Sequence, residues 1–380
     1  MSGTKHAKLS PSAAARWMSC TAAPTLEAGI EEKPSEYAQE GSQAHQVAEC
    51  KAREAVGLPL LMEMNPIAHD AEMYDAAEFY ANYVKETYLE AKEHCPDAII
   101  ETETRLDLTH WIPEGFGTAD CLIVADDVLH VIDFKYGKGV RVDADQNAQM
   151  MIYALGALGW ADLLYDIRRV ETTIIQPRLS WTSTQVHDAQ ALREWGENVL
   201  APIANAAFTG EGTEFKPAED ACRFCKAAGS CKARADYFVQ LFDENQDETI
   251  TEAEAGEILQ KAAGMKDWLA RLEETVKDAC LAGRAVPGWK IVEGRTRRQY
   301  TDEAEIEKRL RAKKYKVSEI YEKKLLGISK MEKLIGKKKM AELIGDLIEK
   351  PQGSPTLVPE SDSRPAWDPE ADTLQAFDEE

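Results

Sequence analysis

Two aspartates and a lysine in the middle of the chain have the types and spacing for metal-assisted hydrolysis. Asp133 follows Asp120 by 13 residues, and Lys135 comes two positions later. Alternate residues of a β-strand share a face, so Asp133 and Lys135 would point to the same side. Carboxylate and carbonyl oxygens bind Mg²⁺, and a bound cation polarises a phosphoryl oxygen and activates water. We therefore interpret Asp120, Asp133 and the Phe134 carbonyl as metal ligands, with Lys135 orienting or deprotonating the water.

An ordinary ion pair on a solvent-facing strand is the alternative interpretation of Asp133 and Lys135. Their neighbours Val131, Ile132 and Phe134 are apolar, which indicates a buried strand. Burying a charged pair costs free energy, so its presence in such a strand favours a functional site.

The elements around these residues predict an α/β fold. Helical spacing covers residues 10–20, 35–56, 68–94, 145–158 and 189–207, and strand-like segments cover 98–108, 121–124, 128–134 and 170–176. Helices, an antiparallel β group and a further helix and strand follow one another along the chain. We expect a mixed central sheet flanked by helices, with a mainly helical C-terminal extension.

Two predicted helices place further polar side chains near the strands. His45 and Glu49 are one turn apart on the helix over 35–56, and Gln149 and Tyr153 share a face of the helix over 145–158. His45 is a candidate metal ligand through a ring nitrogen. A partly buried surface histidine is the simpler interpretation when His45 is considered alone.

Four cysteines form a candidate metal site of their own. Cys222, Cys225 and Cys231 have the spacing C-x₂-C-x₅-C, and Cys20, at the end of the first helix, is the best candidate for a fourth ligand. Zinc and a [4Fe–4S] cluster both accept four thiolates, so the spacing leaves the metal open. Unliganded thiols are the remaining alternative.

Composition limits the class of protein. The 380 residues include 45 Lys or Arg and 67 Asp or Glu, a net charge of −22. This acidity argues against a domain that binds nucleic acid by basic excess alone, but not against an enzyme that uses divalent cations. No apolar run is long enough to span a membrane, and no secretory signal is evident, so we expect a cytoplasmic protein with reduced cysteines.

The motif order resembles that of the RecB-like branch of the PD-(D/E)XK nucleases. Its elements are His45, Gly117-x-x-Asp120, Asp133-x-Lys135 and Gln149-x-x-x-Tyr153. The resemblance implies a restriction-endonuclease-like core and a Mg²⁺- or Mn²⁺-dependent deoxyribonuclease. It also implies that His45, Asp120, Asp133 and Lys135 form the metal site, and that the helix with Gln149 and Tyr153 supports it and contacts DNA. Glu103 and Glu49 are candidate auxiliary acids.

The cysteine pattern resembles the iron–sulfur staple of CRISPR-associated and AddB-type members of that branch. The resemblance favours a structural [4Fe–4S] cluster over zinc at Cys20, Cys222, Cys225 and Cys231. The chain as a whole resembles DUF2800, a phage and prophage family of predicted exonucleases. Matching features run from residues 8–12 and Trp17-x-x-Cys20 to residues 327–334 and 355–359.

Three regions follow from these patterns. Residues 1–235 form the predicted nuclease domain, 245–350 a mainly helical region with a long helix over 251–281 and a short hairpin, and 351–380 an acidic, disordered tail. Arginines bind phosphate and stack on bases, so candidate DNA contacts are Arg178, Arg295, Arg297 and Arg298.

Three functional hypotheses follow. The first is an exonuclease acting on phage DNA in recombination, replication or repair, within the host cytoplasm, with DNA and a phage recombination or replication protein as partners and an oligomer as one candidate state. The second is a non-catalytic iron–sulfur scaffold that binds DNA on a nuclease-like fold. The third is a zinc-stapled interaction protein, which the charge of −22 favours.

Overall fold

The structure is a computed structural model. It describes residues 7–30, 36–60, 71–162, 165–243, 251–262, 264–290, 292, 303–313, 328, 331, 334, 336–344 and 347–348. Two compact units are present, residues 1–290 and 291–380. Arg295, Arg297, Arg298 and the predicted tail over 351–380 lie outside the described residues. The domain boundaries near residues 235–245 stay predictions.

A five-stranded mixed sheet forms the centre of the first unit, as the sequence predicts. The strands are β1 (Ile99–Asp107), β2 (Phe116–Ala125), β3 (Val128–Phe134), β4 (Arg169–Gln176) and β5 (Trp181–Asp188), and they pair in that order. Among these strands, only the β3–β4 pairing is parallel. The crossover between these two strands contains helix α5 (Ala148–Ala161), as a parallel connection requires. The predicted α/β fold is confirmed.

Strand β5 was not expected from the sequence. It lies at the edge of the sheet, and its side chains alternate between partly buried and exposed. Thr182, Ser183, Thr184 and Gln185 make up its centre. Because an edge strand with polar residues on both faces lacks apolar alternation, it carries little periodic signal.

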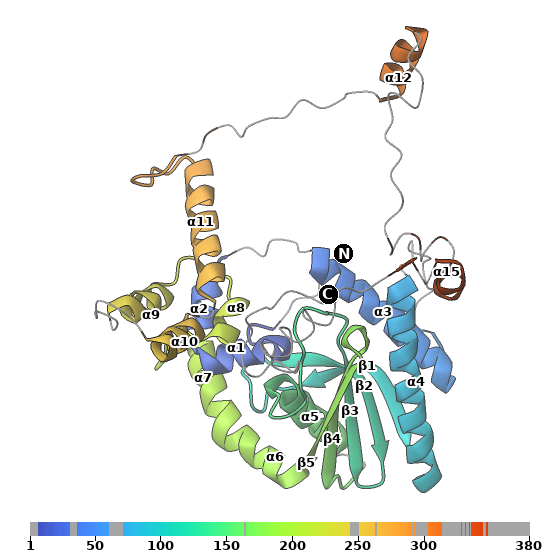
Figure 1. Cartoon of the computed structure of the whole chain (residues 1–380). Coiled ribbons are helices and arrows are strands. Elements are labelled where there is room, and N and C mark those ends of the chain that lie inside the picture. The colour runs from blue at the N-terminus through green and yellow to red at the C-terminus, as the bar shows by residue number, and fades with distance from the viewer. Residues whose placement is uncertain are drawn as a thin grey trace. The chain divides into compact units, whose positions relative to one another are not determined.

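Helices cover both faces of the sheet (Figure 1). Helices α3 (Glu36–Val56) and α4 (Ala71–His94) share one apolar core with Cys121, Ile123 and Phe134. Helix α5 packs in the second core with Leu122 and Val124. Adjacent residues of β2 therefore supply opposite cores, which fixes the register of this strand.

Local sequence explains the two helices nearest the polar residues. On α3, Ala44, Ala48 and Ala52 recur every four residues and are at most 1% exposed, so this stripe packs closely on its neighbours. Helix α5 is apolar on almost all sides and is buried in its core. The Asn147 side chain caps it by accepting the Met150 N–H at 3.2 Å.

The remaining elements of the first unit are helices and single helical turns. They are a 3₁₀ turn (Pro11–Ala13), α1 (Ala14–Ser19), α2 (Ala23–Glu27), a 3₁₀ turn (Pro177–Leu179), α6 (Ala189–Trp195), a π-helical turn (Gly196–Leu200), α7 (Ala201–Thr209), α8 (Glu219–Arg223), α9 (Lys232–Asp243), α10 (Glu252–Lys261) and α11 (Met265–Leu281). The single helix predicted over 251–281 is wrong. Gly264, with φ +80°, separates α10 from α11 because a left-handed residue ends a helix.

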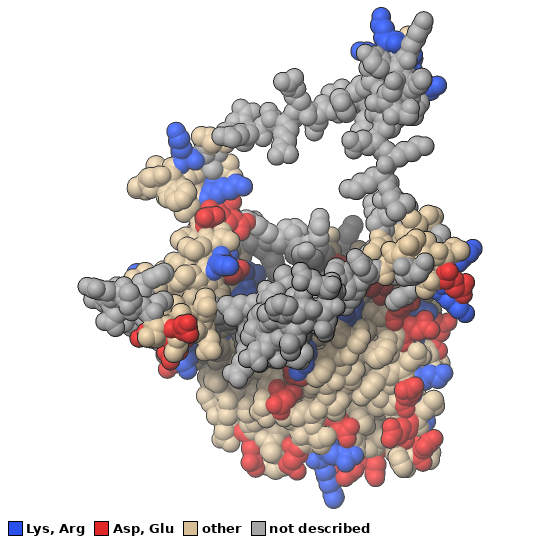
Figure 2. All heavy atoms as spheres, in the orientation of Figure 1, with Lys and Arg blue, Asp and Glu red and all other residues tan. Residues whose placement is uncertain are grey.

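The second unit contains helices α12 (Glu303–Ala312) and α15 (Lys337–Ile344). Within the described residues of the whole chain, no helix combines the length and apolar character that crossing a bilayer demands. On the face drawn in Figure 2, acidic and basic side chains of the described residues are interspersed, without one continuous basic track.

Candidate metal centre

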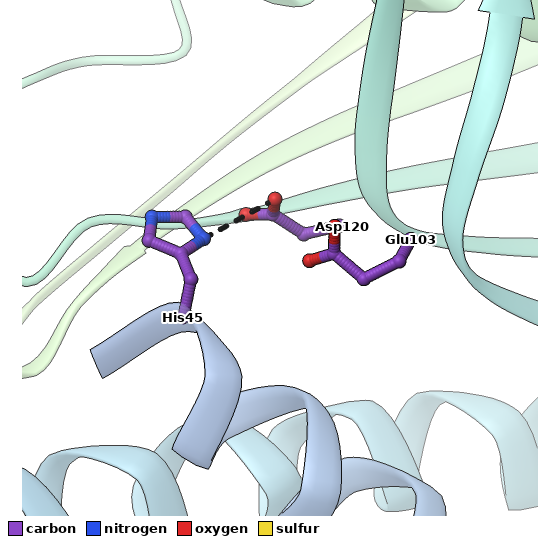
Figure 3. Close-up of side chains that lie close together, drawn as sticks. All are labelled: His45, Glu103 and Asp120. Carbon is purple, nitrogen blue, oxygen red and sulfur yellow. Dashed lines mark ion pairs between the residues drawn. The ribbon is translucent and has the colours of Figure 1, made fainter. Parts of the chain in front are cut away.

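His45, Glu103 and Asp120 converge from three elements (Figure 3). One potential ligand atom from each residue lies within 4.8 Å of the other two. His45 Nδ1 is 3.3 Å from Asp120 Oδ1. Helix α3 supplies the imidazole, and strands β1 and β2 supply the carboxylates. Among the described residues, no other three histidine, cysteine, aspartate or glutamate side chains bring their ligand atoms this close together.

The two strands are distorted where they supply these acids. Thr102 pairs with Cys121 and Thr104 with Ala119, so Glu103 lies opposite Asp120, yet these two residues do not pair. Glu103 has φ +49°, the left-handed region that costs a non-glycine residue roughly 1–2 kcal/mol. Such strain is often found at functional sites.

The same distortion aims the Asp120 side chain toward α3. Ala119 and Leu122 pack in the same core, whereas strict alternation would place them on opposite faces. Asp120 and its neighbour Cys121 therefore both lie on the α3 side of the sheet, while the register of β1 with β2 is unchanged across this point. Figure 3 shows the side chains of Asp120 and Glu103 side by side, facing His45.

Strand β3 holds the Asp120 carboxylate in place. The Phe134 N–H donates to Asp120 Oδ2 at 2.7 Å, and the Phe134 ring packs edge-on against the His45 ring, with centroids 5.4 Å apart. Phe134 thus positions both residues. The role of its carbonyl as a metal ligand stays a prediction.

Asp133, Lys135 and Gln149 form a second cluster next to the first. Asp133 is 3% exposed. Lys135 Nζ is 3.0 Å from Asp133 Oδ2 and donates to Gln149 Oε1 at 3.1 Å, while Gln149 Nε2 donates to Asp133 Oδ1 at 3.2 Å. Within the described part of the chain, Asp133 Oδ2 accepts no hydrogen bond of good geometry. The Lys135 ammonium is therefore held in one orientation beside a buried carboxylate.

Burial and mutual repulsion perturb the acids of the site. Burial, together with the Asp120 and Glu49 charges, raises the pKa of Glu103 to about 7. Burial also raises the pKa of Asp133, although Lys135 opposes it. The pKa of Asp120 shifts in the opposite direction. Burial would raise it, but His45 and the Phe134 N–H outweigh burial and lower it. A bound cation would stabilise all of these acids in their charged forms.

The imidazole responds to the same charges. Burial disfavours the charged form of His45, but the Asp120 carboxylate outweighs burial and raises its pKa. Glu49, one turn along α3, lines the same cleft as His45 and Glu103. Its Oε1 is buried and has no hydrogen-bond partner among the residues that the structure describes, and burial raises its pKa.

Tyr153 lies beside the second cluster on α5. It is 8% exposed and is one turn from Gln149 on the same helix. Gly117 lies against the Tyr153 ring so closely that a Cβ there would be 2.8 Å from Cε1. Tyr153 thus packs against β2, while its support of the site and its contact with DNA stay predictions.

Arg178 is occupied by acidic residues. Its guanidinium donates to both carboxylate oxygens of Glu72, at 3.0 and 3.1 Å, and lies 3.5 Å from Glu40. It also lies over the Tyr136 ring, and its side chain is 8% exposed. DNA contact by Arg178, which stays a prediction, would require these ion pairs to open.

The four predicted cysteines line one cavity. Cys20, Cys222, Cys225 and Cys231 face it together, and burial raises the pKa of Cys225 to about 12. No three of the described sulfur atoms lie within 4.8 Å of one another. Tetrahedral zinc, with Zn–S bonds near 2.3 Å, would hold its sulfurs about 3.8 Å apart.

Residues 7–30 are hydrogen-bonded to residues 222–231, the segment with three of the four cysteines, which we call the cysteine loop. Arg16 Nη1 donates to the Phe224 carbonyl at 3.0 Å, and Glu27 Oε1 accepts the Lys226 N–H at 2.8 Å. Arg16 and Glu27 also pair with each other at 3.2 Å. Residues about 200 positions apart in the sequence are thereby joined around Cys20 and Cys225.

Comparison with known proteins gives a family over most of the chain. The profile of the family described as "Protein of unknown function (DUF2800)" matches residues 6–365. The chain belongs to the DUF2800 family. Among solved structures, this DUF2800 chain matches one titled "Crystal structure of SSO0001" at 13% sequence identity, covering 55% of this chain and 92% of that one with a TM-score of 0.22.

One residue that lines the cysteine cavity of this DUF2800 chain was not predicted from the sequence. Arg234, on α9, lines the cavity and is 3% exposed. It follows Cys231 by three positions, but nothing in that spacing distinguishes it from the other arginines. Glu103, predicted only as an auxiliary acid, lies with His45 and Asp120.

Proposed function

We propose that the chain is a metal-dependent DNA nuclease of the RecB-like PD-(D/E)XK type, acting as an exonuclease on phage or prophage DNA in recombination, replication or repair. The observation that carries this proposal is the convergence of His45, Glu103 and Asp120 beside the Asp133–Lys135 pair. Oxygen and imidazole ligands gathered next to a fixed ammonium are the parts that phosphodiester hydrolysis needs. The protein would act in the cytoplasm of the bacterial host, with a phage recombination or replication protein as a partner.

The donor set fits a hard divalent cation. Glu103 and Asp120 offer carboxylate oxygens, and Asp133 Oδ2 is a buried oxygen without a well-formed hydrogen bond. Carboxylates with one imidazole suit Mn²⁺ or Mg²⁺. When bound, the cation supplies Lewis acidity toward a phosphoryl oxygen and a water of lowered pKa.

The protein's own groups would orient the reacting atoms. Gln149 fixes the Asp133 carboxylate and the Lys135 ammonium together, so Nζ has a defined direction. Lys135 can then hold the attacking water and offset negative charge on the phosphoryl group. In hydrolysis the water oxygen bonds to phosphorus, the bond from phosphorus to the leaving sugar oxygen breaks, and that oxygen takes a proton.

We propose that the cysteine cavity holds a [4Fe–4S] cluster, with zinc as the alternative occupant. Four cysteines line the cavity, and a cubane takes four thiolates. Within the described part of the chain, Arg234 Nη1 is buried without a hydrogen-bond partner, and it is a cationic donor suited to an anionic cluster. Holding residues 7–30 against the cysteine loop would be a structural role.

A digestion assay tests the nuclease proposal. Anaerobically purified protein is incubated with end-labelled linear and circular DNA, single- and double-stranded, in Mg²⁺ or Mn²⁺. We expect linear DNA to be shortened from an end and circular DNA to survive. Cleavage of the circles would replace the exonuclease by an endonuclease, and no degradation of any substrate by cluster-loaded protein would favour a DNA-binding scaffold.

A further inference from the structure

Arg234 is the most deeply buried charged group outside the candidate metal centre that faces a cavity in the described part of the chain. It lies on α9, is 3% exposed and lines the space into which Cys20, Cys222, Cys225 and Cys231 open. Few arginines are buried to this extent without a partner, because removing a guanidinium from water costs free energy.

The hydrogen bonds of Arg234 are unequally distributed between its two terminal nitrogens. Nη2 approaches the Gly264 carbonyl and Asp267 Oδ2, both at 3.4 Å. Nη1 is buried and has no hydrogen-bond partner among the described residues. A guanidinium carries five N–H donors, so the donors of Nη1 require an acceptor that these protein groups do not supply.

We propose that Arg234 Nη1 donates a charge-assisted hydrogen bond to the sulfur atoms of an anionic iron–sulfur cluster held by the four cysteines. The inference rests on the proposed cluster and goes beyond it by assigning a non-cysteine residue to its surroundings. Arg234 is a positioning residue, which stabilises the negative charge of the cluster and satisfies the remaining donors of its own guanidinium. Hydrogen bonds to cluster sulfurs and nearby charge are what set the reduction potentials of such centres.

Arg234 also joins the cluster to helix α11. Its Nη2 reaches Asp267 on α11, and Arg271, one turn further, donates to the Cys225 carbonyl at 3.1 Å. Gly229 lies so close to α11 that a Cβ there would be 2.6 Å from the Arg271 carbonyl oxygen. The cysteine loop is thus in contact with α11, a helix beyond the predicted nuclease domain, and Arg234 connects the two.

The consequence is a dependence of the reduction potential on Arg234. Reduction by one electron adds one negative charge to the cluster, and a neighbouring guanidinium stabilises the reduced state more than the oxidised one. Removing the positive charge therefore lowers the potential. Lysine keeps the charge but loses the second donor and the fixed fork, so its effect is smaller.

The test compares Arg234→Met and Arg234→Lys with the wild type, all purified anaerobically as the full chain. Arg193→Met is the control, since Arg193 is paired with Asp162 and does not line the cysteine cavity. Iron and acid-labile sulfide are measured per chain, and the midpoint potential is measured by dithionite titration followed in the visible spectrum and by electron paramagnetic resonance.

We expect Arg234→Met to lower the equilibrium constant for reduction at least tenfold, about 59 mV for one electron, or to lose at least half of the cluster iron. Arg234→Lys should retain more iron and shift the potential less, and Arg193→Met should match the wild type. If Arg234→Met does not fold, Arg234→Lys decides, and a potential and iron content equal to the wild type overturn the inference.

Two further outcomes also overturn it: an Arg234→Met protein identical to the wild type, and a wild-type protein that contains zinc or no metal at these cysteines. Neither outcome contradicts the nuclease proposal, because the DNA digestion assay measures that separately. Conversely, a cluster whose potential depends on Arg234 in a protein that degrades no DNA would support this inference and reject the nuclease.

Discussion

Substitution of Gly117 by alanine tests how strand β2 supports the candidate site. A Cβ at this position would lie 2.8 Å from Tyr153 Cε1 and 3.0 Å from Pro11 Cγ. Ordinary contacts begin near 3.4 Å, so the tyrosine ring must retreat by about 0.6 Å within a closely packed core. Because Tyr153 lies one turn from Gln149 on α5, a shift of its ring would disturb the side chain that orients Asp133 and Lys135.

The expected change in stability can be worked from these contacts. Overpacking of a core costs about 1–3 kcal/mol, and replacing glycine by alanine restores about 0.5–1 kcal/mol by restricting the unfolded chain. We expect Gly117→Ala to lower the free energy of unfolding by up to about 2.5 kcal/mol. The proposed nuclease activity should also fall, because the orientation of Lys135 changes.

Gly159→Ala is the matched control. Gly159 lies on the same helix as Tyr153 and is exposed, and a Cβ added there would have open space around it, with no atom within 4 Å. Removing glycine from a helix interior should raise stability by about 0.5–1 kcal/mol. Urea unfolding followed by circular dichroism measures both variants, and a Gly117→Ala protein as stable as Gly159→Ala would refute the packing described for Tyr153.

Three other predictions follow. Lys135→Ala and Asp133→Ala should each reduce Mg²⁺-dependent degradation of linear DNA at least about 100-fold with an unchanged far-ultraviolet spectrum; retained activity in either variant would remove that residue from the mechanism. Burial of His130 lowers its pKa despite Glu171, so the unfolded state binds the proton more tightly and stability should fall as the pH decreases through about 6.5; a smaller pH dependence of urea unfolding in His130→Asn checks this, and an unchanged one contradicts it. Cys20→Ala, or removal of the metal at the cysteines, should release residues 7–30 from the cysteine loop and speed their proteolysis; cleavage at the wild-type rate would show that the contacts of Arg16 and Glu27 suffice without a metal.

Local sequence patterns were sufficient to predict which side chains are neighbours when both residues belong to, or directly adjoin, the same strand or helix. Asp133 lies on the apolar strand β3 and Lys135 directly follows its last residue, and the structure places their charged atoms 3.0 Å apart. Gln149 and Tyr153 are one turn apart on helix α5. The α/β class with a mixed sheet also followed from the order of the periodic segments. In each case the relevant spacing is that of one strand or one helix.

Only the tertiary structure decided which distant residues meet. Glu103 lies opposite Asp120 because of the register between β1 and β2, and its left-handed φ has no counterpart in residue spacing. Cys20 meets Cys222, Cys225 and Cys231 at one cavity because the N-terminal segment is bound to residues 222–231. Gly264 divides a helix that periodicity alone would continue. Residue types thus determined which chemistries the chain can carry out, while strand register and helix packing, which depend on contacts between distant segments, determined which side chains share a site.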